Sequence, residues 1–260
     1  MYRIGAQQGS YGQITGVAQA WADATVQHLS PSLWVDARDV TSEGNLAAWP
    51  AKVGTAPTQA TESKKPAGDF DGWAADNGPA VGFDGVGECM QTTTPDLNGG
   101  TAYTIAATYK AGSNGAHRII AEFNTDWATT NGCALQQANS TGVVLGSSGD
   151  GTNYRYSTGG SDTSSTEVCA VITSDRATSG AAMGMSYVNG SNVSDFDTTS
   201  GADPTGNFAS STWHIGSRND GAARPLDGTI RELVIYSTGL WSSASVESVD
   251  GALRFKAGLL

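Results

Sequence analysis

Hydrolysis of a glycosidic bond usually requires two carboxylate side chains, and one short segment of this sequence comes near that arrangement. Glu122, Asn124 and Asp126 alternate along the chain, so an extended strand would place them on one face. A retaining hydrolase holds its two carboxyl groups about 5 Å apart, one as nucleophile and one as proton donor. Because Asn and Asp also favour turns, we interpret the segment as the polar end of a strand. No catalytic residue is predicted.

The histidines offer no better candidate for acid–base chemistry. They are isolated along the chain, without the H-x-H or H-E-x-x-H spacing of a metal site and without a nucleophile elbow beside them. We therefore expect surface or packed side chains at His28, His117 and His214.

Calcium binding is another chemistry that carboxylates in loops support. Asp84, Asp220 and Asp227 lie in Gly-rich segments, and carboxylates together with backbone carbonyls are the oxygen ligands that Ca²⁺ takes. The Asp-Gly pair is also a common turn signal, and we favour that interpretation. Calcium is thus the one cofactor that the sequence leaves open.

Aromatic side chains in polar loops indicate a surface for sugars, because the C–H face of a sugar packs on a ring while its hydroxyls need hydrogen-bond partners. Trp127 stands in the segment NTDWATTNG, and Asn153, Tyr154 and Tyr156 belong to the segment NYRY. Both segments lie among turn-forming residues, where a large ring is less often buried in the core than in a strand. We predict a carbohydrate-binding site from these four residues. The alternative, that the rings cap the fold or form a subunit contact, stays open.

Composition and charge limit the class of protein and its partners. The chain has 260 residues, of which 34 are glycine and 15% are charged, as is typical of an all-β protein with many short strands and turns. Its formal net charge of −11 repels phosphate backbones, so we expect no nucleic acid partner. No apolar run reaches the length of a membrane span, and we expect no membrane insertion.

Alternating apolar residues and turn residues predict the strands that carry these side chains. Residues 103–109 alternate as a half-buried strand does, and residues 229–236 end in a continuous apolar run that indicates cover on both faces. Asn189 and Gly190 supply the positive φ values of a tight turn, which predicts a hairpin across residues 183–196. Further short strands are predicted at residues 118–123, 133–137, 142–145, 168–173 and 212–216.

A helix is predicted near each end of the chain. Near the C-terminus, Val246, Val249 and Leu253 keep helical spacing after a cap at Ser242 or Ser243. Near the N-terminus, residues 17–29 form the other helix.

The N-terminal helix has an apolar face that must be covered. Trp21 and Leu29 lie on that face, which packs either on the chain's own sandwich or on a partner subunit, and the sequence favours neither. We accordingly divide the chain into an arm, residues 1–30, whose docking residues are Trp21 and Leu29, and a main domain, residues 31–260.

The order of several landmarks resembles a known family. Residues 32–39 (SLWVDARD), 77–85 (NGPAVGFDG), 187–190 (YVNG) and 214–253 are similar, in that order, to LamG-type concanavalin A-like lectin/glucanase domains. Such domains occur in bacterial surface proteins and in phage virion proteins. The resemblance covers residues 32–258 and implies an all-β jelly-roll sandwich of two antiparallel sheets, with a short N-terminal arm and a C-terminal helix. It implies little about activity, because this fold hosts binding, catalysis and architecture alike.

The resemblance also bears on catalysis. Glucanases of this fold carry the pattern E-x-D-x-x-E on one strand, and no segment of this sequence matches it. Because the retaining mechanism uses two carboxylates, the missing pattern argues against a glycoside hydrolase. We expect a protein that is not an enzyme.

The beginning of the chain leads to the functional hypothesis. The module is of an extracellular kind, whereas residues 1–8 lack the apolar core of a secretory signal. Virions resolve this conflict, because they assemble in the cytoplasm and leave by lysis. We therefore predict a homo-oligomeric virion structural or accessory protein, as a capsid decoration or tail-associated protein, which contacts capsid or tail proteins and adheres to host-surface glycans. The alternative is an extracellular carbohydrate-binding module or adhesin of a bacterial cell surface; a glycoside hydrolase is disfavoured.

Overall fold

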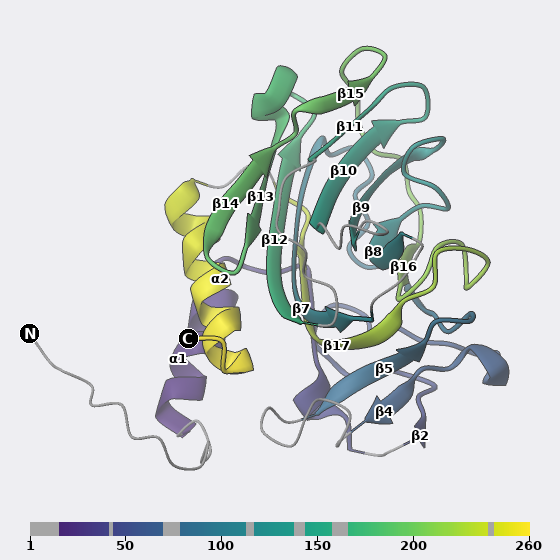
Figure 1. Cartoon of the computed structure of the whole chain (residues 1–260), viewed down its shortest axis with the longest axis vertical. Helices are drawn as coiled ribbons and strands as arrows, with labels where there is room; N and C mark the ends of the chain where they lie inside the picture. Colours follow the sequence, from purple (N-terminus) through teal and green to yellow (C-terminus); the bar gives the residue numbers. More distant parts are fainter. Residues whose placement is uncertain are drawn as a thin grey trace, which may run out of the picture.

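Two β-sheets stacked face to face form the body of the molecule, and two helices lie against the larger sheet (Figure 1). The computed structural model describes residues 16–41, 44–69, 79–112, 117–137, 144–157, 166–238 and 242–260. Neighbouring strands run antiparallel in both sheets. The predicted all-β jelly-roll sandwich is therefore confirmed.

The larger sheet, sheet A, has the strand order β14-β13-β12-β7-β17-β5-β4-β2, and β1 pairs with both β17 and β3. Its two longest strands, β7 and β17, lie at its centre, and most of their residues are buried. The bounds are β1 Leu33–Asp36, β2 Gly44–Asn45, β3 Ala51–Val53, β4 Ala67–Asp69, β5 Ala80–Asp84, β7 Ala102–Ala111, β12 Glu167–Asp175, β13 Gly184–Val188, β14 Ser191–Asp195 and β17 Asp227–Tyr236.

The smaller sheet, sheet B, has the strand order β15-β11-β10-β9-β8-β16-β6. At its β15 end the short strands β11 and β15 are neighbours in the sheet, although β12, β13 and β14 of sheet A lie between them in the sequence. The bounds are β6 Met90–Thr92, β8 Arg118–Phe123, β9 Asn131–Gln137, β10 Val144–Asp150, β11 Tyr154–Tyr156, β15 Thr198–Ser200 and β16 Trp213–Ile215.

The main apolar core lies between the two sheets. Ile105 and Tyr109 of β7 face Phe123 of β8 and Trp213 of β16, and all four side chains are fully buried. Because successive side chains of a strand point to opposite faces, every second residue of these strands reaches this core. Burial of apolar surface on this scale, at about 25 cal/mol per Å², supplies the main driving force for folding.

A second apolar core lies between sheet A and the helices α1 (Gly16–His28) and α2 (Ser243–Ala257). Ala106 and Val234 on the outer face of the sheet meet Val249 and Leu253 of α2 and Val26 of α1. The predicted C-terminal helix is confirmed, with the Ser242 hydroxyl accepting a hydrogen bond from the Ser245 backbone N–H at 3.3 Å. No helix within the described residues is both long enough and apolar enough to cross a membrane.

The prediction of a half-buried strand at residues 103–109 was wrong, and the position of the helices explains why. Strand β7 is buried on both faces, because α2 covers its outer side. That side carries the small residues Thr104, Ala106 and Thr108, which let a helix approach closely. When the outward-facing residues of a strand are this small, the alternating pattern is the same whether a helix or water covers them. The sequence pattern therefore does not predict the helix that covers β7.

The predicted hairpin and the predicted doubly covered strand are both confirmed. Strands β13 and β14 pair across a turn at Asn189 and Gly190, whose φ angles are 48° and 86°. Strand β17 is buried from Ile230 to Tyr236, between the main core on one side and the helices on the other.

Candidate functional site

Three aromatic side chains that the sequence singled out meet near one end of sheet B, at β11, the strand next to the edge strand β15. Trp127 comes from the loop between β8 and β9, while Tyr154 and Tyr156 both belong to β11. The Trp127 ring lies 5.1 Å from the Tyr154 ring in a T-shaped arrangement and 6.3 Å from the Tyr156 ring, measured between centroids. The two tyrosine rings are 6.1 Å apart, with 34° between their planes. We call these three residues the aromatic cluster.

Strand register places the aromatic cluster on the outer face of sheet B. Cys133 points into the main core, so its neighbour Ala134 points outward. Ala134 pairs with Ser147 of β10, which in turn pairs with Tyr156, and residues paired across strands share a face. Tyr154, two residues before Tyr156, lies on the same face.

Glycines allow the Trp127 loop to lie directly on the sheet. A Cβ added to Gly149 would stand 2.1 Å from the Trp127 carbonyl oxygen, and one added to Gly132 would stand 3.1 Å from the Trp127 Cα. These two glycines pair with each other across β9 and β10. The loop therefore needs glycine at both positions to bring Trp127 against the tyrosines.

The structure corrects the prediction that Trp127 is an exposed sugar-binding ring. Its side chain is only 6% exposed, and its indole N–H has no hydrogen-bond partner among the described residues. Tyr154 and Tyr156 are partly exposed. Trp127 is buried because its loop folds over β9 and β10, so it supports the tyrosines from the side, and the tyrosines form the accessible surface.

Glu122 takes part in fixing this loop. Its carboxylate accepts a hydrogen bond from the Trp127 backbone N–H at 3.0 Å and two from the Arg218 guanidinium, at 2.8 and 3.0 Å. Arg218 also contacts Asp126 at 3.0 Å. Glu122 is fully buried, and burial raises the pKa of its carboxyl in spite of the attraction of Arg218. The expected polar strand end is in fact a buried ion pair at Glu122.

Asn153 braces the loops beside the tyrosines. Its side-chain oxygen accepts a hydrogen bond from the Ala202 backbone N–H at 3.0 Å. Its own backbone N–H donates to Asp150 Oδ1 at 2.8 Å, within a turn. Asn153 lies next to the predicted site, as the sequence indicated, and its amide oxygen is already used by the protein.

Two hydroxyl side chains complete the surface, and the sequence reasoning missed both. Strand β15 pairs with β11 so that Ser200 lies opposite Tyr154 and Thr198 lies opposite Tyr156. The two hydroxyls therefore line the same face as the two rings. Sequence reasoning did not predict β15, because a three-residue strand of Thr and Ser carries no alternation to detect.

The three aspartates proposed as calcium ligands do not form one ligand set. Asp84 Oδ1 accepts a hydrogen bond from the Val86 backbone N–H at 2.8 Å, as in a turn. Asp220 is bound by Lys64 Nζ at 2.7 Å, and Asp227 pairs with Asp84 across β17 and β5. Within the described ranges, no group of three or more His, Cys, Asp or Glu side chains is placed to hold a metal ion.

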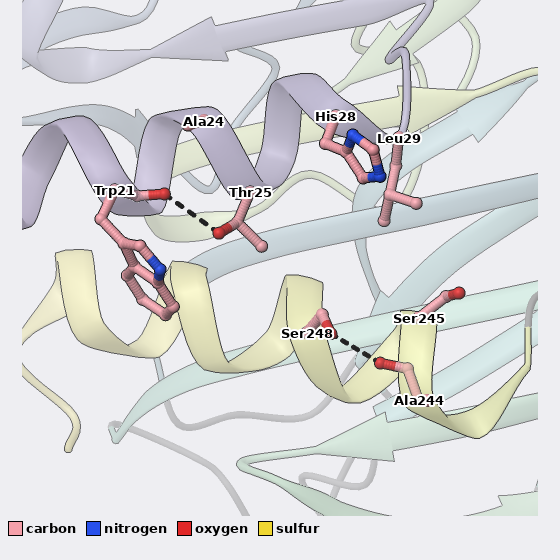
Figure 2. A pocket seen from close by; sticks show the side chains of 8 residues that line it. All are labelled: Trp21, Ala24, Thr25, His28, Leu29, Ala244, Ser245 and Ser248. Carbon is pink, nitrogen blue, oxygen red and sulfur yellow. Dashed lines mark hydrogen bonds between the residues drawn. The ribbon is translucent and has the colours of Figure 1, made fainter.

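The predicted N-terminal docking helix packs on its own chain. Figure 2 shows α1 and α2 side by side. The groove between them has a volume of about 550 Å³. Trp21 borders this groove with 58% of its side chain exposed, and its ring makes a T-shaped contact with Phe255 at 6.2 Å. Leu29 lines the other end of the groove and is half-buried. Docking of a partner subunit on Trp21 and Leu29 stays a prediction.

Buried charges hold α1 and α2 on sheet A. Lys256 of α2 contacts Asp23 of α1 at 2.9 Å and Asp36 of β1 at 3.3 Å, and it also pairs with Glu232 of β17. Burial acts to raise the pKa of Asp36, but the hydrogen bond from Arg38 and the charges of Lys256 and Arg38 outweigh it and lower that pKa to about 2. Helix α2 thus contacts the sheet through ion pairs as well as an apolar face, and the same lysine ties α1 to α2.

Comparison with known proteins defines the class to which this fold and surface belong. A profile of the concanavalin A-like lectin/glucanases superfamily matches residues 84–244, more than half of the chain. The chain belongs to this superfamily. A search among curated proteins returned no match.

Solved structures with a similar fold include parts of glycan-processing enzymes. Domain 4 of a GH43 extracellular arabinanase from Geobacillus stearothermophilus, in complex with arabinotriose, is 18% identical with a TM-score of 0.52, covering 74% of this chain and 84% of that one. Trypanosoma rangeli sialidase in complex with sialic acid is 16% identical with a TM-score of 0.50, covering 92% of this chain and 38% of the sialidase. At these identities the likeness shows a shared lectin-like fold.

Proposed function

We propose that the chain is a non-enzymatic glycan-binding module. The observation that carries this proposal is the pair of partly exposed rings, Tyr154 and Tyr156, held side by side on the outer face of sheet B. A flat aromatic surface packs against the C–H face of a sugar, and hydroxyl groups beside it serve the sugar's own hydroxyls. Ser200 and Thr198 are in position to serve in that way.

The structural neighbours are consistent with this function. The arabinanase domain of the same fold was solved with arabinotriose, and the sialidase was solved with sialic acid. Both are proteins that act on or bind carbohydrate, so a carbohydrate ligand is the first class to test.

Two observations support the non-enzymatic part of the proposal. Glu122, the best acidic candidate of the sequence, has no exposed surface and is held by Arg218. Asp126, its nearest acidic companion, contacts the same guanidinium. A general acid and a nucleophile must both reach the substrate, and the fully buried Glu122 does not.

The setting we propose is the surface of a virion, where the chain is a capsid decoration or tail-associated protein; a bacterial cell surface is the alternative. Its support is the resemblance to LamG-type domains, which occur in virion proteins as well as in bacterial surface proteins; the net charge of −11 disfavours contact with nucleic acid in either setting. Immunogold labelling of purified particles and of intact cells distinguishes the two settings. Labelling confined to cells would contradict the virion setting.

Replacement of either tyrosine tests the glycan-binding function. We expect Tyr154→Ala and Tyr156→Ala to weaken binding to the glycans recognised on an array by about tenfold or more, because each removes one ring from the surface. Tyr154→Phe and Tyr156→Phe keep the rings and are expected to retain most of the affinity. Binding is measured by array fluorescence and then by isothermal titration calorimetry.

The matched control is Trp21→Ala, which removes an exposed aromatic ring beside α2, on the opposite side of the molecule. It should leave glycan binding unchanged. Equal binding by Tyr154→Ala and the unaltered chain, with both fully folded by circular dichroism, would dismiss this surface as the glycan site.

A further inference from the structure

We infer that the site takes an uncharged glycan chain through at least two consecutive sugar units, rather than a single terminal or acidic sugar. The inference rests on the proposed function and specifies its ligand. Its basis is a repeat within the site: the same combination of ring and hydroxyl occurs twice, in register along two neighbouring strands.

The repeat consists of two pairs of side chains. Tyr154 faces Ser200 across β11 and β15, and Tyr156 faces Thr198 two residues further along. All four side chains lie on one face, because paired residues share a face and alternate residues return to it. No hydrogen bond links either tyrosine hydroxyl or the Ser200 hydroxyl to another described residue, so these groups are available to a ligand. The Thr198 hydroxyl donates to Asp197 Oδ1 at 3.3 Å and keeps its lone pairs to accept a hydrogen bond from a sugar hydroxyl.

The geometry of the rings suits adjacent units of a chain. Their centroids are 6.1 Å apart and their planes differ by 34°. One sugar ring covers one phenol ring, so two rings at this separation present two contiguous stacking positions. A single sugar unit fills one position and leaves the other ring in water.

Trp127 keeps the two positions fixed. Its buried ring contacts Tyr154 edge to face at 5.1 Å and Tyr156 at 6.3 Å, so both tyrosines share one support. A preformed pair of rings costs less ordering entropy on binding than two mobile rings. Trp127 is therefore a positioning residue for both units.

The charges around the rings disfavour an acidic sugar. Arg155, the one charged residue in β11 and β15, pairs with Asp203 through its Nε and donates from Nη1 to the Phe196 carbonyl at 2.9 Å. Asp150 is held by backbone N–H groups, at 2.9 Å from Thr152 and 2.8 Å from Asn153. Arg155 is thus already neutralised, and the net charge of −11 repels anions.

Calorimetry with oligosaccharide ladders tests the inference. The probes are neutral ladders of arabinose, xylose and glucose units, from the monosaccharide to the hexasaccharide, with sialyllactose as the acidic probe. For a ladder that binds, we expect affinity to rise about tenfold or more between one unit and two or three units, then to level off. Sialyllactose should bind at least about tenfold more weakly than the best neutral chain.

Variants locate the two units. Tyr154→Ala should remove the gain in affinity between the monosaccharide and longer chains while keeping the weak binding of one unit, and Tyr156→Ala should do the same. Ser200→Ala and Thr198→Val should each lower the affinity for longer chains by severalfold. Ser210→Ala, which changes an exposed hydroxyl bonded to Asp96, is the control and should have no effect.

The outcomes separate this inference from the proposed function. Equal affinity for one unit and for longer chains, or tightest binding to sialyllactose, with Tyr154→Ala still impairing binding, would overturn the two-unit inference and leave the glycan site in place. Absence of binding to every carbohydrate would overturn both.

Discussion

Single residues at the candidate site differ in exposure, and we propose that the exposed rings contact a ligand while the buried residues hold those rings in place. Tyr154 and Tyr156 are partly exposed, whereas Trp127 is buried against them and tied through its backbone N–H to Glu122. Sequence reasoning identified all three aromatic residues and assigned them one role. Their roles differ because burial depends on the path of a loop, and residue type alone does not determine that path.

Trp127 is expected to affect glycan binding without contacting the glycan. Trp127→Ala removes the common support of both tyrosines, so we expect severalfold weaker binding and a loss of about 3 kcal/mol in the free energy of unfolding. Trp127→Phe keeps a ring in the same space and should restore most of the binding. Affinity is measured by calorimetry at a temperature where urea titration shows each variant to be folded. Unchanged binding by folded Trp127→Ala would contradict the supporting role.

At the scale of helices and strands, one buried lysine joins the two helices to sheet A. Lys256 lies among Asp23, Asp36 and Glu232 and is 4% exposed, so α2 reaches sheet A and α1 through the same ammonium group. A buried charge is tolerated only when its partners compensate for the loss of water. These residues come from four separate elements, and no local pattern in the sequence connects them.

Lys256→Met is expected to destabilise the fold strongly. It removes one of the two cations, Lys256 and Arg38, that contact both the Glu232 and the Asp36 carboxylate. Loss of a partner from a buried ion pair costs about 3 to 5 kcal/mol of unfolding free energy. Lys65→Met is the control, because Lys65 pairs with Glu62, whose side chain is 70% exposed, and its loss should cost far less. Urea denaturation measures both. A loss of similar size in the two variants would contradict the importance of the buried network.

The same network predicts how stability depends on acid. The pKa of Asp36 in the folded chain is about 2, below the ordinary value of 3.8, so the folded state favours the ionised carboxylate. Its contribution is fully present above about pH 4 and is lost as the pH falls towards 2. We expect the unfolding free energy to decrease over this range by about 2 kcal/mol on account of Asp36. Asp36→Asn should flatten that part of the pH profile, measured by thermal unfolding at matched ionic strength.

The whole molecule consists of three layers, a helix layer and two sheets, in which each sheet has a different outer environment. Helices cover the outer face of sheet A through a second apolar core (Figure 1). The outer face of sheet B carries the aromatic cluster and its hydroxyl neighbours. The side of the molecule opposite α1 and α2 is therefore the side proposed for the ligand.

Removal of the arm tests whether α1 belongs to the main domain. A chain that begins at Ser30 lacks Ala22 and Val26, both fully buried in the second core, and loses Asp23 from the charge network. We expect a lower melting temperature and concentration-dependent self-association, because apolar surface on α2 and sheet A becomes exposed. A chain that begins at Gly16 keeps α1 and is the control. Scanning calorimetry and sedimentation velocity provide the measurements; an unchanged melting temperature would show that the arm is separable.

The sequence by itself determined the features that depend on neighbouring residues. Alternation and turn chemistry identified the hairpin at Asn189 and Gly190 and the apolar strand β17, and the order of landmarks identified the superfamily. The tertiary structure alone decided that Trp127 is buried, that Ser200 and Thr198 stand beside the two tyrosines, and that helices cover β7. The physical reason is that burial and cross-strand pairing depend on contacts between residues far apart in the chain. The local periodicity of the sequence does not specify which distant segment packs over a given residue.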